Sequence, residues 1–339
     1  MLGLIKWSAQ MNLRKNIRSL TEIEIETFTD ALVELKRKGI YDKFVHWHHH
    51  VMNPSIWPWE PNDPNYRNGA HRGPSFLPWH REFLVQLETE LQKIDSSITL
   101  PYWNWTEDSA NPESSVLWKD NFLGGNGLES DSWRVQTGKF SHSTGNWPVP
   151  AYPSEGYPEE GLKRQFGLIT PSIPTEEDVA LALRESFYDT PPYNQSPFTV
   201  GFRNRLEGWV TQRGDPSVTT EGTQLHNRIH VWVGGNMLLM TSPDDPVFFL
   251  HHCYVDKVWA DWQSRMAERN PNWAPHYAPL KDGPSGHNID DVLNPWARTV
   301  REVLDPAALG YEYGQPVSLF STSKNLLPDE KEFISPFVQ

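Results

Sequence analysis

The chain has 339 residues, a formal net charge of −13 and one cysteine, Cys253. This acidic balance, without a clustered Lys/Arg patch, argues against a nucleic-acid partner, and a single cysteine excludes an intrachain disulfide. The sequence has no apolar run of about 18 residues and no signal-peptide core, so we expect a cytoplasmic protein without a membrane span.

The first predicted helix is marked at both ends. Thr21 and Glu24 have the spacing of a capping box, and Gly39 is a suitable stop after a helix that runs to about Lys38. A second helix is expected to begin near Asp42.

The second predicted helix carries a cluster of histidines, and the helical period selects one of them. His48 lies in the middle of an apolar arc, so its imidazole should face the core. The arc also contains Phe44, Val45 and Met52, whereas the histidines at its edge or outside it are His46, His49 and His50.

A third helix is predicted around Pro78, which suits a first helical turn. His80 heads an apolar stripe that continues through Phe83, Leu84, Leu87, Leu91 and Ile94. His71 is out of phase with this stripe, so it must reach a shared site from the preceding loop. His48, His71 and His80 therefore form one potential metal-binding trio.

The middle of the chain favours loops over long elements. Residues 100–105 form a short buried segment, and residues 107–175 are rich in Gly, Pro, Ser and Asn. Helical patterning returns at 175–186 and 202–209, and 270–295 is again irregular. Because no linker is apparent, we expect one domain over residues 1–339.

A second histidine set follows. His226 and His230 are four residues apart, which places both imidazoles on one helical face. His252 heads a stripe formed with Val255, Trp259, Trp262 and Met266, so it should also point inward. These histidines could simply cap helices or fill a core, but their combined pattern favours a metal site.

The type of ligand indicates the metal. Two imidazole trios supply six neutral nitrogens without a carboxylate or thiolate. Three histidines could hold Zn²⁺ with an open position, yet hydrolytic two-metal sites normally recruit carboxylates, so a zinc or iron hydrolase is a remote alternative. An all-imidazole pair suits copper, and two copper(I) ions can each give one electron to O₂.

Three segments resemble the copper A and copper B motifs of the tyrosinase family, most closely its compact bacterial type. They are residues 71–84, 226–235 and 245–256, and residues 41–48 are similar to the family's first ligand segment. The resemblance implies a mainly α-helical four-helix bundle that carries two coppers and is wrapped by loops with little β-structure. Its core spans about 14–314, with 315–339 as a tail.

The resemblance also assigns the ligands. It implies that copper A is bound by His48, His71 and His80, and copper B by His226, His230 and His252. His251, the first of the His-His pair, is then not a ligand.

Two departures from some relatives have consequences. Gly69 occupies the position of a cysteine that many eukaryotic members crosslink to a histidine, so that thioether is absent. The segment after Tyr313 and Gly314 is too short for a shielding domain, so we expect an enzyme that is active once copper is loaded. Cys253 is expected to be a small buried residue beside a ligand.

The implied activity is that of a tyrosinase, which uses O₂ to hydroxylate monophenols and to oxidise o-diphenols to o-quinones. A catechol oxidase or an o-aminophenol oxidase without the hydroxylation step is the alternative, and a hemocyanin-like O₂ carrier is more remote. The implied partners are small phenols and, potentially, a copper-delivery protein. The oligomeric state is left open.

Hydroxylation requires a group that takes the phenol proton. The family attributes this to a water held by a glutamate and an asparagine, which implies Glu207 and Asn227, with Glu221 as a competitor of Glu207. The resemblance places Met240 over copper A, with core or rim packing as an equal alternative. Phe248, four residues before His252, is expected to stack beneath the substrate ring, with core packing as an equal alternative.

The ends of the core are expected to be tied together. Arg14 or Arg18 is predicted to contact the pair formed by Tyr311 and Tyr313, in a structural role.

Overall fold

The structure is a computed structural model that describes residues 11–52, 68–149, 160–210, 223–272 and 276–314. Seven α-helices occur in this part of the chain: α1 (Glu22–Arg37), α2 (Tyr41–Met52), α3 (Phe76–Gln92), α4 (Glu176–Leu183), α5 (Phe202–Glu207), α6 (Leu225–Val233) and α7 (Val247–Arg269). The expected mainly α-helical fold is therefore confirmed.

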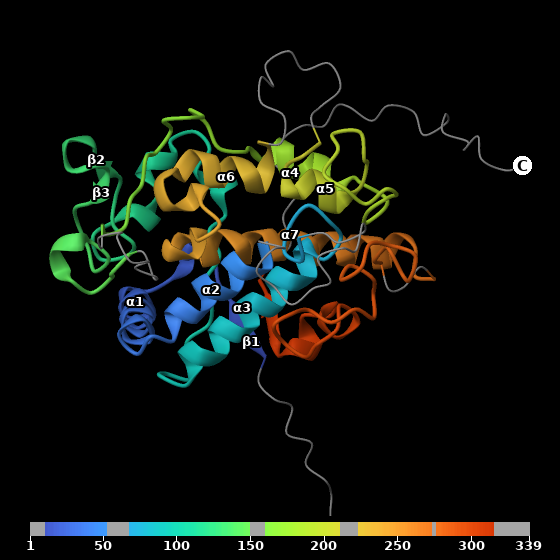
Figure 1. The fold of residues 1–339 in the computed structure, drawn as a ribbon, viewed down its shortest axis with the longest axis horizontal. Coiled ribbons are helices and arrows are strands. Elements are labelled where there is room, and N and C mark those ends of the chain that lie inside the picture. Colours follow the sequence, from blue (N-terminus) through green and yellow to red (C-terminus); the bar gives the residue numbers. More distant parts are fainter. Residues whose placement is uncertain (1–10, 53–67, 150–159, 211–222, 273–275, 315–339) are drawn as a thin grey trace, which may run out of the picture.

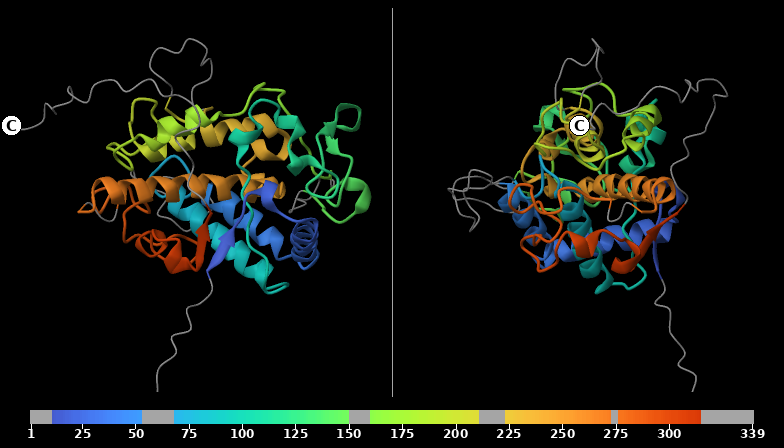
Figure 2. Two further views of the ribbon diagram at one scale, coloured as in Figure 1. Left: turned by 180° about the vertical axis from the view of Figure 1, so that it is seen from behind. Right: turned by 90° about the vertical axis from the view of Figure 1, so that its right-hand side faces the viewer.

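The longest helix, α7, runs through the middle of the molecule (Figure 1). Helices α2 and α3 lie on one side of it, and α6 lies on the other, an arrangement that the view from behind repeats (Figure 2). These four helices carry almost all the histidines singled out above, so the bundle brings distant parts of the sequence to one place.

The local sequence signals account for the helix ends. The side chain of Thr21 accepts the Glu24 N–H and the Glu24 side chain accepts the Thr21 N–H, which completes the predicted capping box of α1. Pro78 lies in the first turn of α3, as expected. One expectation is wrong: Ile94 is 37% exposed, because α3 ends at Gln92 before the apolar stripe reaches it.

The segments between the helices are mostly loops and short 3₁₀ turns. β-Structure in the described chain is limited to two small sheets. Strands β2 (Gly127–Leu128) and β3 (Arg134–Val135) pair antiparallel, whereas β1 (Asn12–Arg14) and β4 (Tyr311–Tyr313) pair parallel. The second pair joins the two ends of the described chain (Figure 2).

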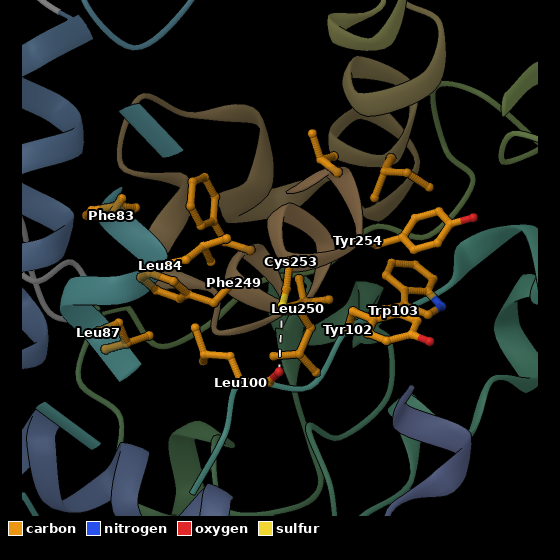
Figure 3. Close-up of a cluster of buried hydrophobic side chains, with 14 of the residues drawn as sticks. Phe83, Leu84, Leu87, Leu100, Tyr102, Trp103, Phe249, Leu250, Cys253 and Tyr254 are labelled. Carbon is orange, nitrogen blue, oxygen red and sulfur yellow. Dashed lines mark hydrogen bonds between the residues drawn. The ribbon is translucent and has the colours of Figure 1, made fainter. Parts of the chain in front are cut away.

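A dense apolar core packs α3 against α7 (Figure 3). Phe83, Leu84 and Leu87 face Phe249 and Leu250 across it. Cys253 is fully buried there, beside His252, with its Sγ 3.6 Å from the Leu100 main-chain oxygen. Cys253 is therefore a small buried residue, as predicted.

A buried ionic cluster ties both ends of the described chain to α7. The Arg14 guanidinium lies 3.5 Å from the ring centroid of Tyr311 and donates to the Tyr313 hydroxyl. Asp256 accepts both tyrosine hydroxyls, at 2.6 Å each, and the Nε–H of Arg81 at 2.6 Å. Of the two arginines considered, Arg14 therefore makes the contact.

Arg18 instead forms ion pairs with Glu107 and Asp108. Among the described residues, no helix is both long and apolar enough to cross a membrane.

Candidate metal centre

Four helices and one loop bring seven histidines to the interior. Helix α2 supplies His48, α3 supplies His80, and α6 supplies His226 and His230. Helix α7 supplies His251 and His252, and His71 comes from the loop before α3. In each of two groups, one ring nitrogen from every member lies within 4.8 Å of the others.

The second group contains four histidines, His226, His230, His251 and His252, and three of them have the geometry of a metal-binding trio. The Nε2 atom of His252 lies 3.2 Å from Nε2 of His226 and 3.4 Å from Nε2 of His230. Nitrogens that bind one ion tetrahedrally at about 2.0 Å are separated by about 3.3 Å. Nε2 of His252 therefore lies at the spacing from the other two that a shared ion requires, and the donor nitrogens of all three residues lie within 4.8 Å of one another.

Hydrogen bonds on the far side fix the tautomers of two of these rings, those of His226 and His230, whereas Nδ1 of His252 has no partner among the described residues. Nδ1 of His226 donates to the Asn227 Oδ1 at 2.9 Å and to the Glu207 main-chain oxygen at 3.2 Å. Nδ1 of His230 donates to the Met237 main-chain oxygen at 2.8 Å. Because carbonyl oxygens can only accept, Nδ1 carries the proton and the Nε2 lone pair is directed inward.

The first group contains His48, His71 and His80, all buried. Nδ1 of His48 donates to the Met240 main-chain oxygen at 2.7 Å, and Nδ1 of His80 donates to that of Phe76 at 2.8 Å. Among the described residues, the buried Nε2 atoms of His48 and His80 have no partner, and neither has Nδ1 of His71. Buried nitrogens are normally paired, so these orphaned atoms indicate a place for a ligand such as a metal ion.

The two trios are neighbours. The rings of His80 and His252 stack with centroids 4.1 Å apart, and the centroids of His71 and His226 are 5.9 Å apart. Two ions held by these trios would therefore lie close enough to act on one small molecule.

Burial keeps the imidazoles neutral. Desolvation lowers the pKa of His48 to about 3 and that of His230 to about 4, and it lowers the pKa values of the other buried members well below the usual range for histidine. Neutral imidazole is the form that binds a metal, so the site is prepared for an ion at neutral pH.

The loop that carries His71 is held by distant side chains that the sequence did not reveal. The Tyr188 hydroxyl donates to the Pro74 main-chain oxygen at 2.6 Å. Nδ1 of His287 accepts the Ser75 N–H at 3.1 Å. These contacts span more than a hundred residues and come from separate loops, so no local pattern could have indicated them.

Gly73 allows this close approach. A Cβ atom at that position would lie 2.6 Å from Cε1 of His287, which is closer than real side chains pack. The loop therefore requires glycine at position 73.

The structure places both residues of the expected water-holding pair beside His226. Asn227 lines the cavity described below. Glu207 is fully buried: one carboxylate oxygen accepts the Arg72 N–H at 2.6 Å and the other accepts from Arg203 at 2.9 Å. Desolvation raises the pKa of Glu207 above its usual value, whereas the Arg203 charge opposes this. The competitor Glu221 lies outside the described residues.

Arg203 was not expected from the sequence. It is fully buried and bonds both Asp189, at 2.6 Å, and Glu207. An arginine four residues before a glutamate on a helix suggests an ion pair, but its burial depends on packing of α5 that the pattern does not show.

A cavity of about 320 Å³ opens over the histidines. Its lining is mostly apolar or histidine and consists of His48, Met52, His71, Arg72, Trp209, His226, Asn227, His230, Val231, Met237, Leu238, Leu239, Met240 and Ser242. A cavity of this size could admit a small aromatic molecule.

Met240 and Phe248 occupy different positions relative to this cavity. Met240 lines it and is 42% exposed. Phe248 is fully buried, stacks on His252 with centroids 4.1 Å apart, contacts His48 and is not part of the lining. His251 is also buried and stacks on His226.

Fold and site together define a class: a helical protein with two adjacent all-histidine metal sites beneath an open cavity. Residues 38–265 match the family model described as the common central domain of tyrosinase. The chain belongs to the tyrosinase family, whose members are dinuclear copper enzymes that use O₂.

Its relatives include the tyrosinase of Streptomyces glaucescens, which is 42% identical over 290 residues, covering 85% of this chain and 94% of that protein. A protein named grixazone synthase from Streptomyces griseus is 37% identical over 323 residues, covering 90% of this chain and 100% of that protein. The similarity thus extends over nearly the full length of both relatives.

Two solved structures share the fold. A mutant polyphenol oxidase from Thermothelomyces thermophila has a TM-score of 0.64 at 23% identity, covering 90% of this chain and 89% of that chain. A functional unit of octopus hemocyanin has a TM-score of 0.52 at 22% identity, covering 89% of this chain and 68% of that chain. At these identities the likeness concerns the fold alone.

Proposed function

We propose that this protein uses O₂ to hydroxylate monophenols at the ortho position and to oxidise o-diphenols to o-quinones. The observation that carries the proposal is the convergence of two neutral histidine trios directly beneath an open, largely apolar cavity. The substrate class is small phenols, whose rings suit such a lining.

The proposed copper ligands are His48, His71 and His80 for one ion, and His226, His230 and His252 for the other. The orphaned inward nitrogens of the first trio and the Nε2 spacing of the second support this assignment. When bound, copper supplies the one-electron steps that O₂ chemistry requires.

The remaining chemistry concerns protons and positioning. Oxidation of an o-diphenol releases two protons, and delivery of a monophenol as phenolate releases one. We assign the acceptance of the phenol proton to a water held by Asn227 and Glu207, because Asn227 faces the cavity and Glu207 lies directly behind His226.

Met240 and Phe248 have separate proposed roles. The flexible thioether of Met240, at the cavity wall, narrows the entrance and adapts to the ring. The burial of Phe248 supports packing against His48 and His252, which would hold their rings in place; contact with the substrate stays a prediction.

A second candidate is an oxidase restricted to o-diphenols or o-aminophenols. The observation that favours it is the engagement of both Glu207 oxygens, one by the Arg72 N–H and the other by Arg203. A carboxylate occupied in this way has less capacity to hold a water against the substrate.

Oxygen consumption by the copper-loaded protein tests the proposal, with 4-methylphenol and 4-methylcatechol as substrates and the metal-free protein as control. Turnover of both supports the monophenol reaction. Turnover of the catechol alone supports the restricted oxidase. Reversible O₂ uptake without steady quinone formation would contradict both and support a carrier.

Two expectations from the sequence, a cytoplasmic location and a copper-delivery partner, stay predictions.

A further inference from the structure

The cavity over the histidines is lined by a positively charged side chain, although the protein as a whole is acidic. Among its described lining residues, Arg72 is the one permanently charged side chain, and no carboxylate lines the wall. The remaining lining is apolar, neutral polar or neutral histidine. The entrance therefore presents a positive charge although the protein has a net charge of −13.

The backbone of Arg72 is fixed. Its φ angle is +62°, a left-handed conformation that non-glycine residues rarely adopt. Its N–H donates to the buried Glu207 carboxylate at 2.6 Å. Strained backbone held by a buried partner occurs preferentially at functional sites.

Arg72 is an exposed residue of the cavity wall, and within the described residues it forms no ion pair with a carboxylate side chain. Its side chain contacts Trp209, with 5.7 Å from the ring centroid to the guanidinium carbon. Trp209 also lines the cavity. The fully buried arginines differ, because Arg14, Arg81, Arg164 and Arg203 each bond a carboxylate.

We propose that Arg72 is a specificity-determining residue that binds the anionic group of phenols carrying a carboxylate on the side chain opposite the hydroxyl. This inference rests on the proposed function, since it assumes that the ring enters with its hydroxyl toward the histidines. A guanidinium matches a carboxylate through two parallel N–H donors, and Arg72 directly follows the proposed ligand His71, at the cavity wall.

Kinetics of the copper-loaded protein test this with three diphenols that differ in charge: 3-(3,4-dihydroxyphenyl)propionate, 4-methylcatechol and dopamine. Arg72→Gln is expected to raise KM for the acid about fivefold, the effect of an exposed ion pair, with little change in kcat. KM for 4-methylcatechol should stay the same, and KM for dopamine should fall slightly.

Three controls separate recognition from general charge or folding effects. Arg72→Lys should retain most of the preference, and Arg72→Glu should reverse it in favour of dopamine. Arg37→Gln, at an exposed position on α1, makes the same change in net charge and should alter none of the three KM values. The preference should also weaken as ionic strength rises.

A binding measurement makes the test independent of turnover. In the zinc-loaded protein, calorimetry compares 3-(4-hydroxyphenyl)propionate with tyramine. We expect tighter binding of the acid, and loss of that preference in Arg72→Gln but not in Arg37→Gln.

The outcomes distinguish the two proposals. If the native protein oxidises 4-methylcatechol but Arg72→Gln leaves the KM ratio of acid to neutral diphenol unchanged, the role of Arg72 is overturned and the proposed function stands. If the native protein oxidises none of the diphenols, the proposed function fails. Calorimetry then decides on Arg72: equal binding of both phenols overturns its role, and an Arg72-dependent preference for the acid supports it.

Discussion

Individual histidines in this site are oriented by hydrogen bonds from the ring nitrogen that points away from the proposed metal position. His48, His80 and His230 each donate Nδ1–H to a main-chain oxygen, so their Nε2 lone pairs are fixed toward the interior. His71 differs, because its orphaned buried nitrogen is Nδ1, the atom taken above as its inward donor. The loop that carries His71 is in turn held by Tyr188 and His287.

The proposed proton-accepting pair leads to a prediction about single residues, which concerns the rates on two substrates. Glu207→Gln or Asn227→Ala should lower kcat for 4-methylphenol about a hundredfold, the usual effect of losing a positioned proton acceptor. Oxidation of 4-methylcatechol should change less than about twofold. Initial rates of O₂ consumption measure both.

The matched control is Glu185→Gln, which removes a half-buried carboxylate from its ion pair with Arg205, away from the cavity lining. It should leave both rates unchanged. Equal loss on the two substrates in Glu207→Gln would reject the assignment.

At the scale of elements, the loop at residues 69–75 is held by contacts with distant segments. Removing the His287 ring leaves the Ser75 N–H without its buried acceptor. We therefore expect His287→Ala to lower copper retention from two ions toward one per folded chain, because His71 is no longer held. Metal analysis after dialysis measures this.

The conservative variant His287→Asn keeps an acceptor and should retain more copper than His287→Ala. His142→Ala, which alters an exposed histidine, should retain two ions. Full retention in His287→Ala, with the fold intact by circular dichroism, would contradict the role given to the loop contacts.

The ionic cluster at α7 gives a prediction about stability. Asp256→Asn leaves Arg81 buried without its carboxylate partner, whereas Arg14 keeps Glu88, and should lower the free energy of unfolding by about 3 kcal/mol. Tyr313→Phe removes one hydroxyl and should cost about 1 kcal/mol. Urea unfolding measures both free energies. Equal small decreases in the two variants would show that this cluster does not hold the ends of the described chain together.

For the whole molecule, the buried histidines predict sensitivity to acid. The pKa of His48 is lowered to about 3 and that of His230 to about 4, whereas an unfolded histidine binds a proton near pH 6.5. Between these values the unfolded chain binds more protons, so stability falls as pH drops below about 6.5. At pH 5 each such group costs about 2 kcal/mol.

The unfolding midpoint of the metal-free protein should therefore be clearly lower at pH 5.5 than at pH 7.5, at constant ionic strength. Burial raises the pKa of Asp189 to about 6 and also raises that of Glu207, and both act in the opposite direction, but the buried histidines outnumber them. His48→Leu should reduce the slope. A midpoint that rises on acidification would contradict the neutral, buried state of the trios.

Sequence alone predicted the parts of this molecule that periodicity and motifs determine. The helical wheel selected His48, and the apolar stripes placed His80 and His252 inward. The contacts of Tyr188 and His287 with the loop before α3 escaped prediction, because each joins segments that only the folded chain brings together. Arg203 and Glu207 lie on one helix, but the complete burial of their ion pair depends on the packing of α5. The prediction that the apolar stripe of α3 continues to Ile94 was wrong, because the helix ends before that position.

The central claim is that two copper ions lie in two adjacent histidine trios. Crystals of the copper-loaded protein, measured at the copper absorption edge, should show two anomalous peaks per chain. One should lie among His48, His71 and His80, and the other among His226, His230 and His252. A single peak, or a second peak bound by His251 in place of His252, would contradict the account.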